Sequence, residues 1–361
     1  MSEVFEQLEG LQKNEKRVAM ATLVATKGTT PKKEGAKMWV GEGGRILGSV
    51  TIGGCVDAQV IEESEAVLAS LKPKRLAMAL GDEEAWELGL SCGGTVEVFI
   101  EPINLDNPDD PMVKVYETIR GEVEKGRPAV AVTPLEATSA KLVVLQDGTT
   151  IGTLGDDALD REARMRALEL IQQRASRTLT LHREPAPLEA FFEVHGPPPT
   201  LIIFGAGHVA MPLVTLAKGL GLKTVVVDGR PRFATRDRFP DADELLIGIP
   251  SEIAETLSYT PSTFVVLVAH DYKYDIPVLK TVLKTDAVYI GMLGSRRRGQ
   301  AILDFLREEG IGDDLLRRIH VPIGLDIGAK TAAEIALGIL AEAICVKAGR
   351  PGTPMRERKS S

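Results

Sequence analysis

The fold is decided by one segment, Thr200-Leu201-Ile202-Ile203-Phe204-Gly205-Ala206-Gly207-His208-Val209-Ala210. It begins with an apolar run of strand length, and a helical stretch to Leu220 follows its glycines. Gly205 permits a tight turn, Gly207 lets the backbone approach a pyrophosphate, and Ala210 allows the helix to pack closely on the strand. Free N–H groups at the start of that helix would face the anion. The segment therefore predicts the first strand, turn and helix of a Rossmann-like domain.

The residues that follow continue the same fold. A second apolar strand, residues 224–227, ends in Asp228, 21 positions after Gly207, where an acid can accept hydrogen bonds from a ribose diol. Apolar strands then alternate with helical stretches, the strands at 244–247, 264–269 and 287–292 and the helices at 251–258, 276–284 and 297–309. This alternation predicts a doubly wound parallel sheet with helices on both faces. The same fold without a bound nucleotide remains an alternative, because one fold hosts unrelated functions.

Ligands of such sheets bind beyond the carboxyl ends of the strands. Besides Gly205 and Gly207, the candidate residues there are His208, Asp228, Arg230, His270, Asp271, Gly294, Ser295 and Arg296. His270 and Asp271 end a strand, so either could be a metal ligand or an acid-base group. Gly294, Ser295 and Arg296 offer backbone and guanidinium donors to a phosphate or a carboxylate.

The part of the chain before this domain contains an internal duplication. Residues 36–40 and 48–50 match 140–144 and 152–154 at a constant shift of 104 positions. The copies extend over about 15–105 and about 125–195, and each predicts strand, hairpin, helix and strand. We therefore expect an α+β domain at 1–195. A stiff proline linker at 196–199, a Rossmann-like domain at 200–349 and a flexible tail at 350–361 should follow it.

Two glycine-flanked cysteines distinguish the first copy. They lie in Gly53-Gly54-Cys55 and Cys92-Gly93-Gly94, and the second copy has Asp157-Ala158-Leu159 opposite the first of these. A helix N-terminus after Cys55 would stabilise a thiolate. Two thiols without further cysteines nearby do not form a structural zinc site, but they could bind a soft metal that a ligand carries. The alternative is that both are small residues in turns, and Cys345, in an apolar helical stretch, is expected to be a buried hydrophobe.

Composition limits the class of protein. The chain has 361 residues, of which 44% are hydrophobic and 26% charged, as in a soluble globular protein of two or three domains. A net charge of −8 without a basic stripe argues against a nucleic-acid partner. No segment has the pattern of a signal peptide or a membrane span. Three cysteines, an odd number, then favour reduced thiols and a cytoplasmic location.

Several ordered segments carry a family resemblance. They are 28–31, 35–38, 53–57 and 91–102 in the first half, and 204–210, Asp228 with Arg230, 238–243, 289–296 and 322–329 in the second. On these segments the chain resembles the XdhC/CoxI family, accessory proteins that handle the molybdenum cofactor of xanthine dehydrogenase-type and carbon monoxide dehydrogenase-type enzymes. Ile52, Asp57 and Ala269 depart from the residues that the family tends to have at these positions.

The resemblance implies a cofactor chaperone with no turnover of its own. Such a protein would bind Mo-molybdopterin, stabilise it while a cysteine desulfurase exchanges its terminal oxo ligand for sulfur, and insert it into an apo xanthine dehydrogenase-type enzyme. It would also self-associate, as a homodimer. The glycine turn and Ser295-Arg296 would then hold the phosphate end, and Cys55 or Cys92 the molybdenum. The alternatives are an NAD(P)-dependent oxidoreductase with His270 as the proton donor, and a scaffold that docks a partner enzyme.

Overall fold

The computed structural model describes residues 3–28, 33–51, 55–79, 94–269 and 272–357. The chain forms two compact units, Met1–Pro197 and Pro198–Ser361, here the N-terminal and the C-terminal unit. Within the described ranges, no helix has the length and apolar character needed to cross a membrane.

The C-terminal unit is built on a six-stranded parallel sheet. Its strands are β11 (Thr200–Phe204), β12 (Lys223–Asp228), β13 (Glu244–Ile247), β14 (Thr263–Leu267), β15 (Tyr289–Met292) and β16 (Ile319–His320). They lie in the order β13-β12-β11-β14-β15-β16, which confirms the predicted parallel Rossmann-like sheet. The chain order reverses between β11 and β14, so the crevice at the carboxyl ends of these two strands is where ligands of such sheets bind.

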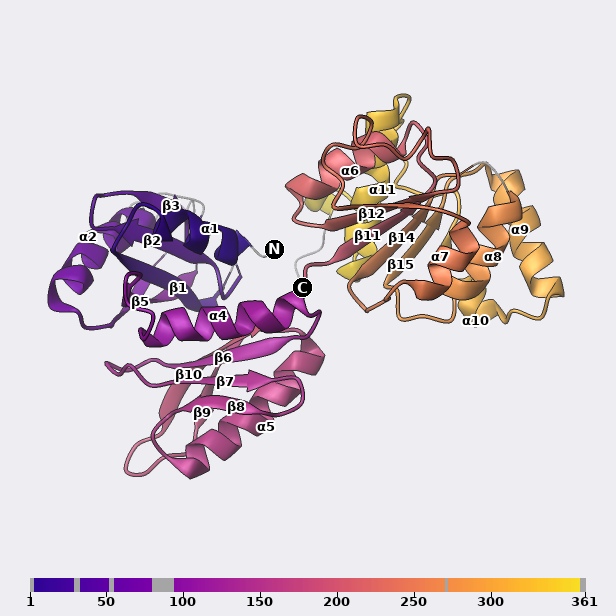
Figure 1. Ribbon diagram of the computed structural model, residues 1–361. Helices are drawn as coiled ribbons and strands as arrows, with labels where there is room; N and C mark the ends of the chain where they lie inside the picture. The colour runs from indigo at the N-terminus through magenta and orange to yellow at the C-terminus, as the bar shows by residue number, and fades with distance from the viewer. Residues whose placement is uncertain (1–2, 29–32, 52–54, 80–93, 270–271, 358–361) are drawn as a thin grey trace. The chain divides into compact units, whose positions relative to one another are not determined.

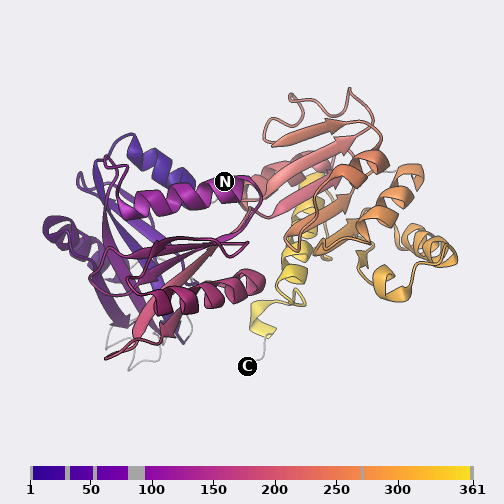
Figure 2. The same ribbon diagram turned by 60° about the horizontal axis from the view of Figure 1, so that its bottom comes forward.

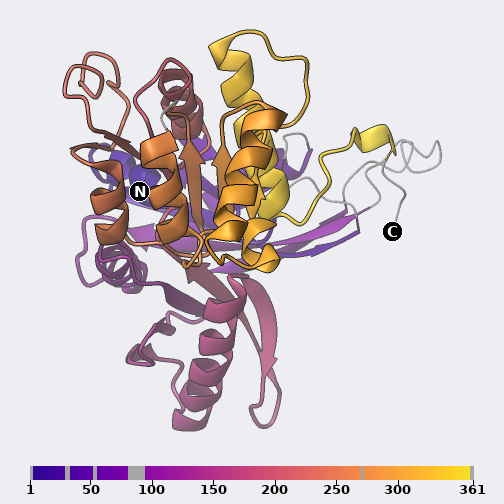
Figure 3. The ribbon, with the colours of Figure 1, turned by 90° about the vertical axis from the view of Figure 1, so that its right-hand side faces the viewer.

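Helices cover both faces of this sheet (Figures 1 and 3). On one face lie α6 (Ala210–Gly219) and α11 (Ala332–Lys347), and on the other lie α7 (Pro250–Thr256), α8 (Tyr272–Val282) and α9 (Arg296–Glu308). Two short helices, α10 (Asp313–Leu316) and η1 (Met355–Glu357), complete the unit. Leu201 and Ile203 of β11 face the first layer, while Ile202 and Phe204 face the second. Because both faces are buried, the strand is apolar at every position rather than at alternate ones.

The N-terminal unit consists of two antiparallel sheets of identical topology. The first has β1 (Arg17–Lys27), β2 (Lys37–Gly41), β3 (Ile46–Gly48), β4 (Lys74–Ala79) and β5 (Thr95–Asn104), and the second has β6 (Ala129–Pro134), β7 (Lys141–Leu145), β8 (Thr150–Thr153), β9 (Arg177–Leu181) and β10 (Leu188–His195). The strand orders are β3-β2-β1-β5-β4 and β8-β7-β6-β10-β9. The predicted duplication of an α+β unit is thereby confirmed.

Each sheet carries its own helix, and two further helices pack on the other faces of the sheets. α2 (Cys55–Ser70) packs on the first sheet, and α5 (Asp157–Gln173) packs on the second. The opposite faces of both sheets share a core with α1 (Glu3–Gln12) and α4 (Pro111–Glu124). α4 and α5 thus lie on opposite faces of the second sheet (Figure 2).

The two copies correspond in detail, but the helix is offset from the sequence alignment by one residue. Asp57 of α2 accepts a hydrogen bond from the Ser49 hydroxyl, and Asp160 of α5 accepts one from the Thr153 hydroxyl. Asp57 and Asp160 are 103 positions apart, whereas the strands match at 104. The counterpart of Cys55 is therefore Ala158, not the Leu159 that the sequence alignment predicts. The second copy still has no thiol there.

Two buried ion pairs join the copies reciprocally. Lys37 of the first copy lies 3.0 Å from the Glu193 carboxylate of the second, and Lys141 of the second copy pairs with Glu101 of the first. The four side chains are almost fully excluded from solvent. Burial raises the pKa of Glu193, but Lys37 and His195 outweigh it, and the pKa is lowered to about 2. The pair that holds the two copies together is therefore ionised at neutral pH.

Candidate cofactor-binding site

The two glycines after β11 have different roles. Gly205 has a φ of +111°, and a Cβ there would lie 2.7 Å from the Ala269 nitrogen, so the turn requires glycine. A Cβ on Gly207 would lie 3.6 Å from the Val268 carbonyl oxygen, an ordinary contact. The structure itself therefore does not require glycine at 207, and the open backbone there leaves room for a ligand.

The start of α6 presents backbone donors. Val209 caps the helix without a side-chain hydrogen bond. In the described part of the chain, the N–H groups of Gly207 and His208 donate no hydrogen bond, and the His208 residue is exposed. Such N–H groups at a helix N-terminus are suited to an anion. The turn therefore has two N–H groups without a protein acceptor among the described residues, at the position where the sequence predicts a phosphate contact.

Asp228, at the end of β12, is buried and fully engaged by the protein. Its carboxylate accepts hydrogen bonds from the Ala206 N–H at 2.7 Å and the Arg230 N–H at 2.8 Å. It also accepts from the Arg230 guanidinium, from Nε at 2.9 Å and from Nη2 at 2.7 Å. Burial raises the pKa of Asp228, but the bonds from Arg230 and Ala206 outweigh it, so the pKa lies below its ordinary value. The carboxylate is therefore an ionised anchor between the loops after β11 and β12.

Phe233 holds the other side of Arg230. The guanidinium carbon of Arg230 lies 3.9 Å from the centre of the Phe233 ring, a cation–π distance. Arg238 stacks near the same ring and donates to the carbonyl oxygens of Ala206 and Phe233. The loop after β12 is thereby tied to the glycine turn at two points.

A cavity of about 460 Å³ opens at this edge of the sheet. Its lining comes from the ends of β11 and β12, from the segment after β14 and from α7 and α8: Phe204, Gly205, Val227, Asp228, Gly229, Arg230, Pro250, Ala269, Tyr274, Asp275 and Val278. The cavity combines apolar walls with a few charged groups, as small-molecule sites do. It is the candidate functional site of the C-terminal unit.

The ion pair of Asp275 and Arg298, near this cavity, could not be predicted from the sequence. Asp275 of α8 is 1% exposed, and its carboxylate lies 2.7 Å from Nη2 of Arg298 on α9. Ser295 caps α9 by accepting from the Arg298 N–H, whereas Arg296 is exposed. The sequence favours Arg296 as the ligand contact because it directly follows Gly294 and Ser295. Only the folded structure identifies Arg298, on α9, as the partner of the buried aspartate on α8.

The structure brings some of the predicted residues together and leaves others untested. Gly205, Asp228 and Arg230 line the cavity, Gly207 and His208 lie in the adjoining turn, and Gly294, Ser295 and Arg296 begin α9 without lining the cavity. Outside the described residues lie Gly53, Gly54, the Cys55 side chain, Cys92, Gly93, His270 and Asp271. No group of three or more His, Cys, Asp or Glu side chains suited to a metal occurs among those described.

The strand directions place the start of α2 and the start of β5, which follow the two cysteine-bearing segments in the sequence, at one edge of the first sheet. α2 begins at Cys55 and is joined to β4 by three residues, Leu71–Pro73, so it runs antiparallel to β4. β4 is antiparallel to β5, with Ala79 beside Thr95. The start of α2 and the start of β5 therefore lie at the same edge, and Gly94, the last glycine of the second cysteine segment, directly precedes β5.

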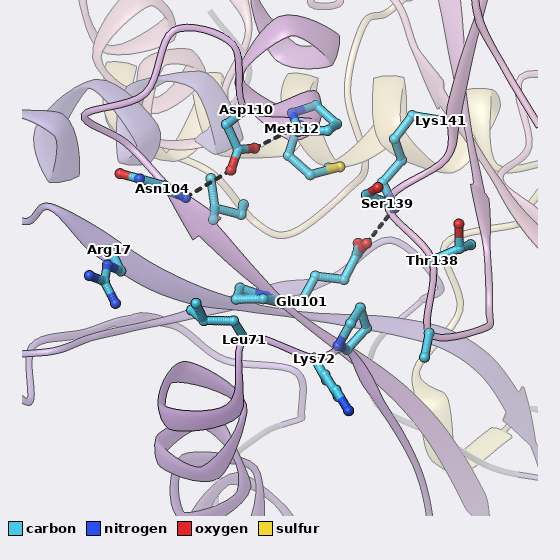
Figure 4. Close-up of a pocket in the computed structure, with 15 residues that line it drawn as sticks. Arg17, Leu71, Lys72, Glu101, Asn104, Asp110, Met112, Thr138, Ser139 and Lys141 are labelled. Atoms are coloured by element: carbon cyan, nitrogen blue, oxygen red, sulfur yellow. Dashed lines mark hydrogen bonds and ion pairs between the residues drawn. The ribbon is translucent and has the colours of Figure 1, made fainter.

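A second cavity, of about 500 Å³, lies at the opposite edge of the same sheet (Figure 4). It is bounded by Leu71 and Lys72 after α2, by the end of β5 and by the loop before Lys141. The buried pair of Glu101 and Lys141 forms part of its wall. Because α2 ends at this edge, the cavity does not coincide with the edge at which α2 begins.

The fold defines an α/β protein in which a Rossmann-like unit follows a duplicated α+β unit. The chain belongs to the XdhC and CoxI family. The model of the XdhC Rossmann domain matches residues 201–343, and the model of the XdhC and CoxI family matches residues 11–78 and 123–182.

Relatives of known name match nearly the whole chain. A protein of Bacillus subtilis (strain 168), named as a probable subunit of xanthine dehydrogenase, is 28% identical, over 93% of this chain and 95% of its own length. The molybdenum cofactor insertion chaperone PaoD of Escherichia coli (strain K12) is 24% identical, over 92% of this chain and 84% of its own. A crystal structure described as a xanthine dehydrogenase from Bacillus halodurans superposes with a TM-score of 0.76 at 26% identity, covering 98% of this chain and 97% of the other.

Proposed function

We propose that this protein is a molybdenum cofactor chaperone. It binds Mo-molybdopterin, stabilises the cofactor while its terminal oxo ligand is exchanged for sulfur, and inserts it into an apo xanthine dehydrogenase-type enzyme. The observation that carries this proposal is the match of nearly the whole chain to a relative named as a molybdenum cofactor insertion chaperone. The partners that follow are a cysteine desulfurase, the recipient molybdoenzyme and a second copy of the chain, all in the cytoplasm.

The C-terminal unit has groups that fit the phosphate of a pterin cofactor. The N–H groups of Gly207 and His208 and the start of α6 would bind the phosphate oxygens. Arg230 contributes positive charge beside them, since its guanidinium is more than half exposed even though it is paired with Asp228. Ser295 and Arg296 are the further proposed contacts at the same end of the sheet.

The N-terminal unit has the residue types that fit the metal. Molybdenum that is already held by sulfur ligands is a soft centre, and thiolates are suitable contacts for it. Cys55 begins α2, where the helix dipole favours a thiolate, and the segment of Cys92 leads into β5 at the same edge. We propose both cysteines as metal contacts and Gly53, Gly54, Gly93 and Gly94 as the backbone that admits the bulky cofactor.

Purification from a host that makes the molybdenum cofactor tests the proposal. The protein is isolated anaerobically, and both its molybdenum content and the fluorescence of the released, oxidised pterin are measured. We expect the two signals to copurify with the wild-type chain. Cys55→Ala and Cys92→Ala should retain much less molybdenum-bound cofactor.

Cys345→Ala is the matched control, because Cys345 is a half-buried thiol on α11 that is assigned no cofactor contact. It should retain the wild-type amount. Wild-type protein that holds no pterin, even after incubation with the isolated cofactor, would refute the proposed function. Equal loss in all three variants would instead refute the assignment of Cys55 and Cys92.

A further inference from the structure

In dinucleotide-binding Rossmann domains, an acid at the end of the second strand accepts hydrogen bonds from a ribose diol. In this protein the corresponding carboxylate, that of Asp228, already accepts its full number of hydrogen bonds from the protein itself. An ionised carboxylate offers about four acceptor positions. Asp228 has four donors on it, namely the N–H groups of Ala206 and Arg230 and two groups of the Arg230 guanidinium. Its residue is only 4% exposed. A ribose diol could therefore donate to Asp228 only after the guanidinium had been displaced.

Arg230 is held in that position from both sides. Phe233 stacks on the guanidinium face, and the two bonds to Asp228 form a fork that only a planar guanidinium makes. Two of its five N–H groups are used in this way, and in the described part of the chain the other three donate to no protein acceptor. These three remain available to an anionic ligand in the cavity.

We propose that Arg230 is the specificity-determining residue of the C-terminal unit, closing the ribose-diol subsite at Asp228 so that the cavity selects ligands by an anionic group and rejects NAD-type ribose recognition. A pterin with a terminal phosphate monoester meets this requirement. A ligand that depends on a free diol at this position does not. The inference concerns the cavity used in the proposed function, but it does not rest on that function, because its test needs no molybdenum.

The test is a fluorescence titration of NADH and NADPH on the wild-type chain and on Arg230→Ala. The substitution frees two acceptor positions on Asp228, and a hydrogen bond to a charged group corresponds to about a tenfold gain in affinity or more. We expect Arg230→Ala to bind NADH at least about tenfold more tightly than the wild type. NADPH should gain nothing, because its 2′-phosphate replaces a donor of the diol and is repelled by the carboxylate.

Two further variants make the result specific. Arg230→Ala combined with Asp228→Asn should lose the gain for NADH, because the carboxylate charge is gone. Arg230→Lys, which keeps the charge but cannot form the fork, should show a smaller gain and serves if the alanine variant does not fold. The proposal is wrong if NADH binds the wild type as tightly as the variants, if no variant gains NADH affinity, or if NADPH gains as much as NADH. None of these outcomes bears on whether the protein retains the molybdenum cofactor.

Discussion

Replacing Lys37 by alanine should destabilise the N-terminal unit far more than removing a surface lysine. The Lys37 side chain is 2% exposed and lies 3.0 Å from the Glu193 carboxylate, whose side chain is 11% exposed. Removing one partner of a buried pair leaves an uncompensated charge and costs about 3–5 kcal/mol. The pKa of Glu193, lowered to about 2 by Lys37 and His195, has the same sign, because these neighbours favour the ionised carboxylate.

Tryptophan fluorescence during urea unfolding at pH 7 measures this effect. Both tryptophans of the chain, Trp39 and Trp86, belong to the N-terminal unit, and Trp39 is fully buried in its core. In a thermal melt followed by the same fluorescence, the expected loss corresponds to a fall in melting temperature of roughly 6–20 °C for a unit of this size. Lys74→Ala is the matched control, because Lys74 pairs with Glu63 at the surface, and such pairs contribute about 1 kcal/mol or less.

Equal losses of stability in Lys37→Ala and Lys74→Ala would show that the buried pair of Lys37 and Glu193 contributes no more to stability than a surface pair. A double variant separates charge from packing. Lys37→Met with Glu193→Leu removes both charges while keeping apolar volume, and it should recover most of the stability that Lys37→Ala loses. If the double variant is as unstable as Lys37→Ala, the loss comes from packing around these positions and not from the unpaired carboxylate.

Three further outcomes are expected. Because the pKa of Glu193 is lowered in the folded state to about 2, its stabilising contribution should be complete above about pH 4.5 and lost as the pH falls toward 2, as tryptophan-detected urea titrations at each pH would show. Gly205→Ala should destabilise the C-terminal unit by about 2 kcal/mol or more in calorimetry, because the residue has a positive φ and a Cβ there would lie too close to the Ala269 nitrogen. Gly207→Ala should leave the melting temperature nearly unchanged and weaken anion binding. Arg298→Ala should cost about 2–3 kcal/mol, since it removes a charged hydrogen bond from an aspartate that is 1% exposed, and equal stability of Arg298→Ala and the exposed Arg296→Ala would contradict this.

The fold could be predicted because its signals are local. Most parallel strands of the C-terminal unit are short apolar runs, and helical stretches follow β11, β13, β14 and β15, while Gly205 and Gly207 mark the first turn. The two-residue strand β16 is too short to give such a signal. The duplication could be predicted because the matched segments have the same register, with Lys37 falling on Lys141. The strands, the turn and the repeat all depend on residues close together in the sequence or at a fixed spacing, and such patterns can be recognised without a structure.

The contacts of the site could not be predicted in the same way. The spacing of Asp228 from Gly207 predicts an acid at the ribose position, but it does not say whether Arg230 turns toward the ligand or toward Asp228. Packing on Phe233 decides this, and stacking of that kind leaves no periodic signal. The reciprocal ion pairs could not be predicted either, because Lys37 and Glu193 are 156 positions apart in the sequence and meet only when the two copies pack together.

The difference between the copies can now be located at the start of one helix. In the second copy, Asp156 caps α5 by accepting from the N–H groups of Ala158 and Leu159. At the offset of 103 positions that Asp57 and Asp160 define, the first copy has Gly53, which has no side chain for this role. The same scaffold is thus stable with an aspartate cap and no cysteine, so the packing of the unit does not require a glycine pair before a thiol. A capped helix start excludes an external anion, while an uncapped one leaves backbone donors for a thiolate or a ligand. The first copy has no capping side chain at Gly53, and this favours a ligand-binding role for Cys55 over a purely structural one.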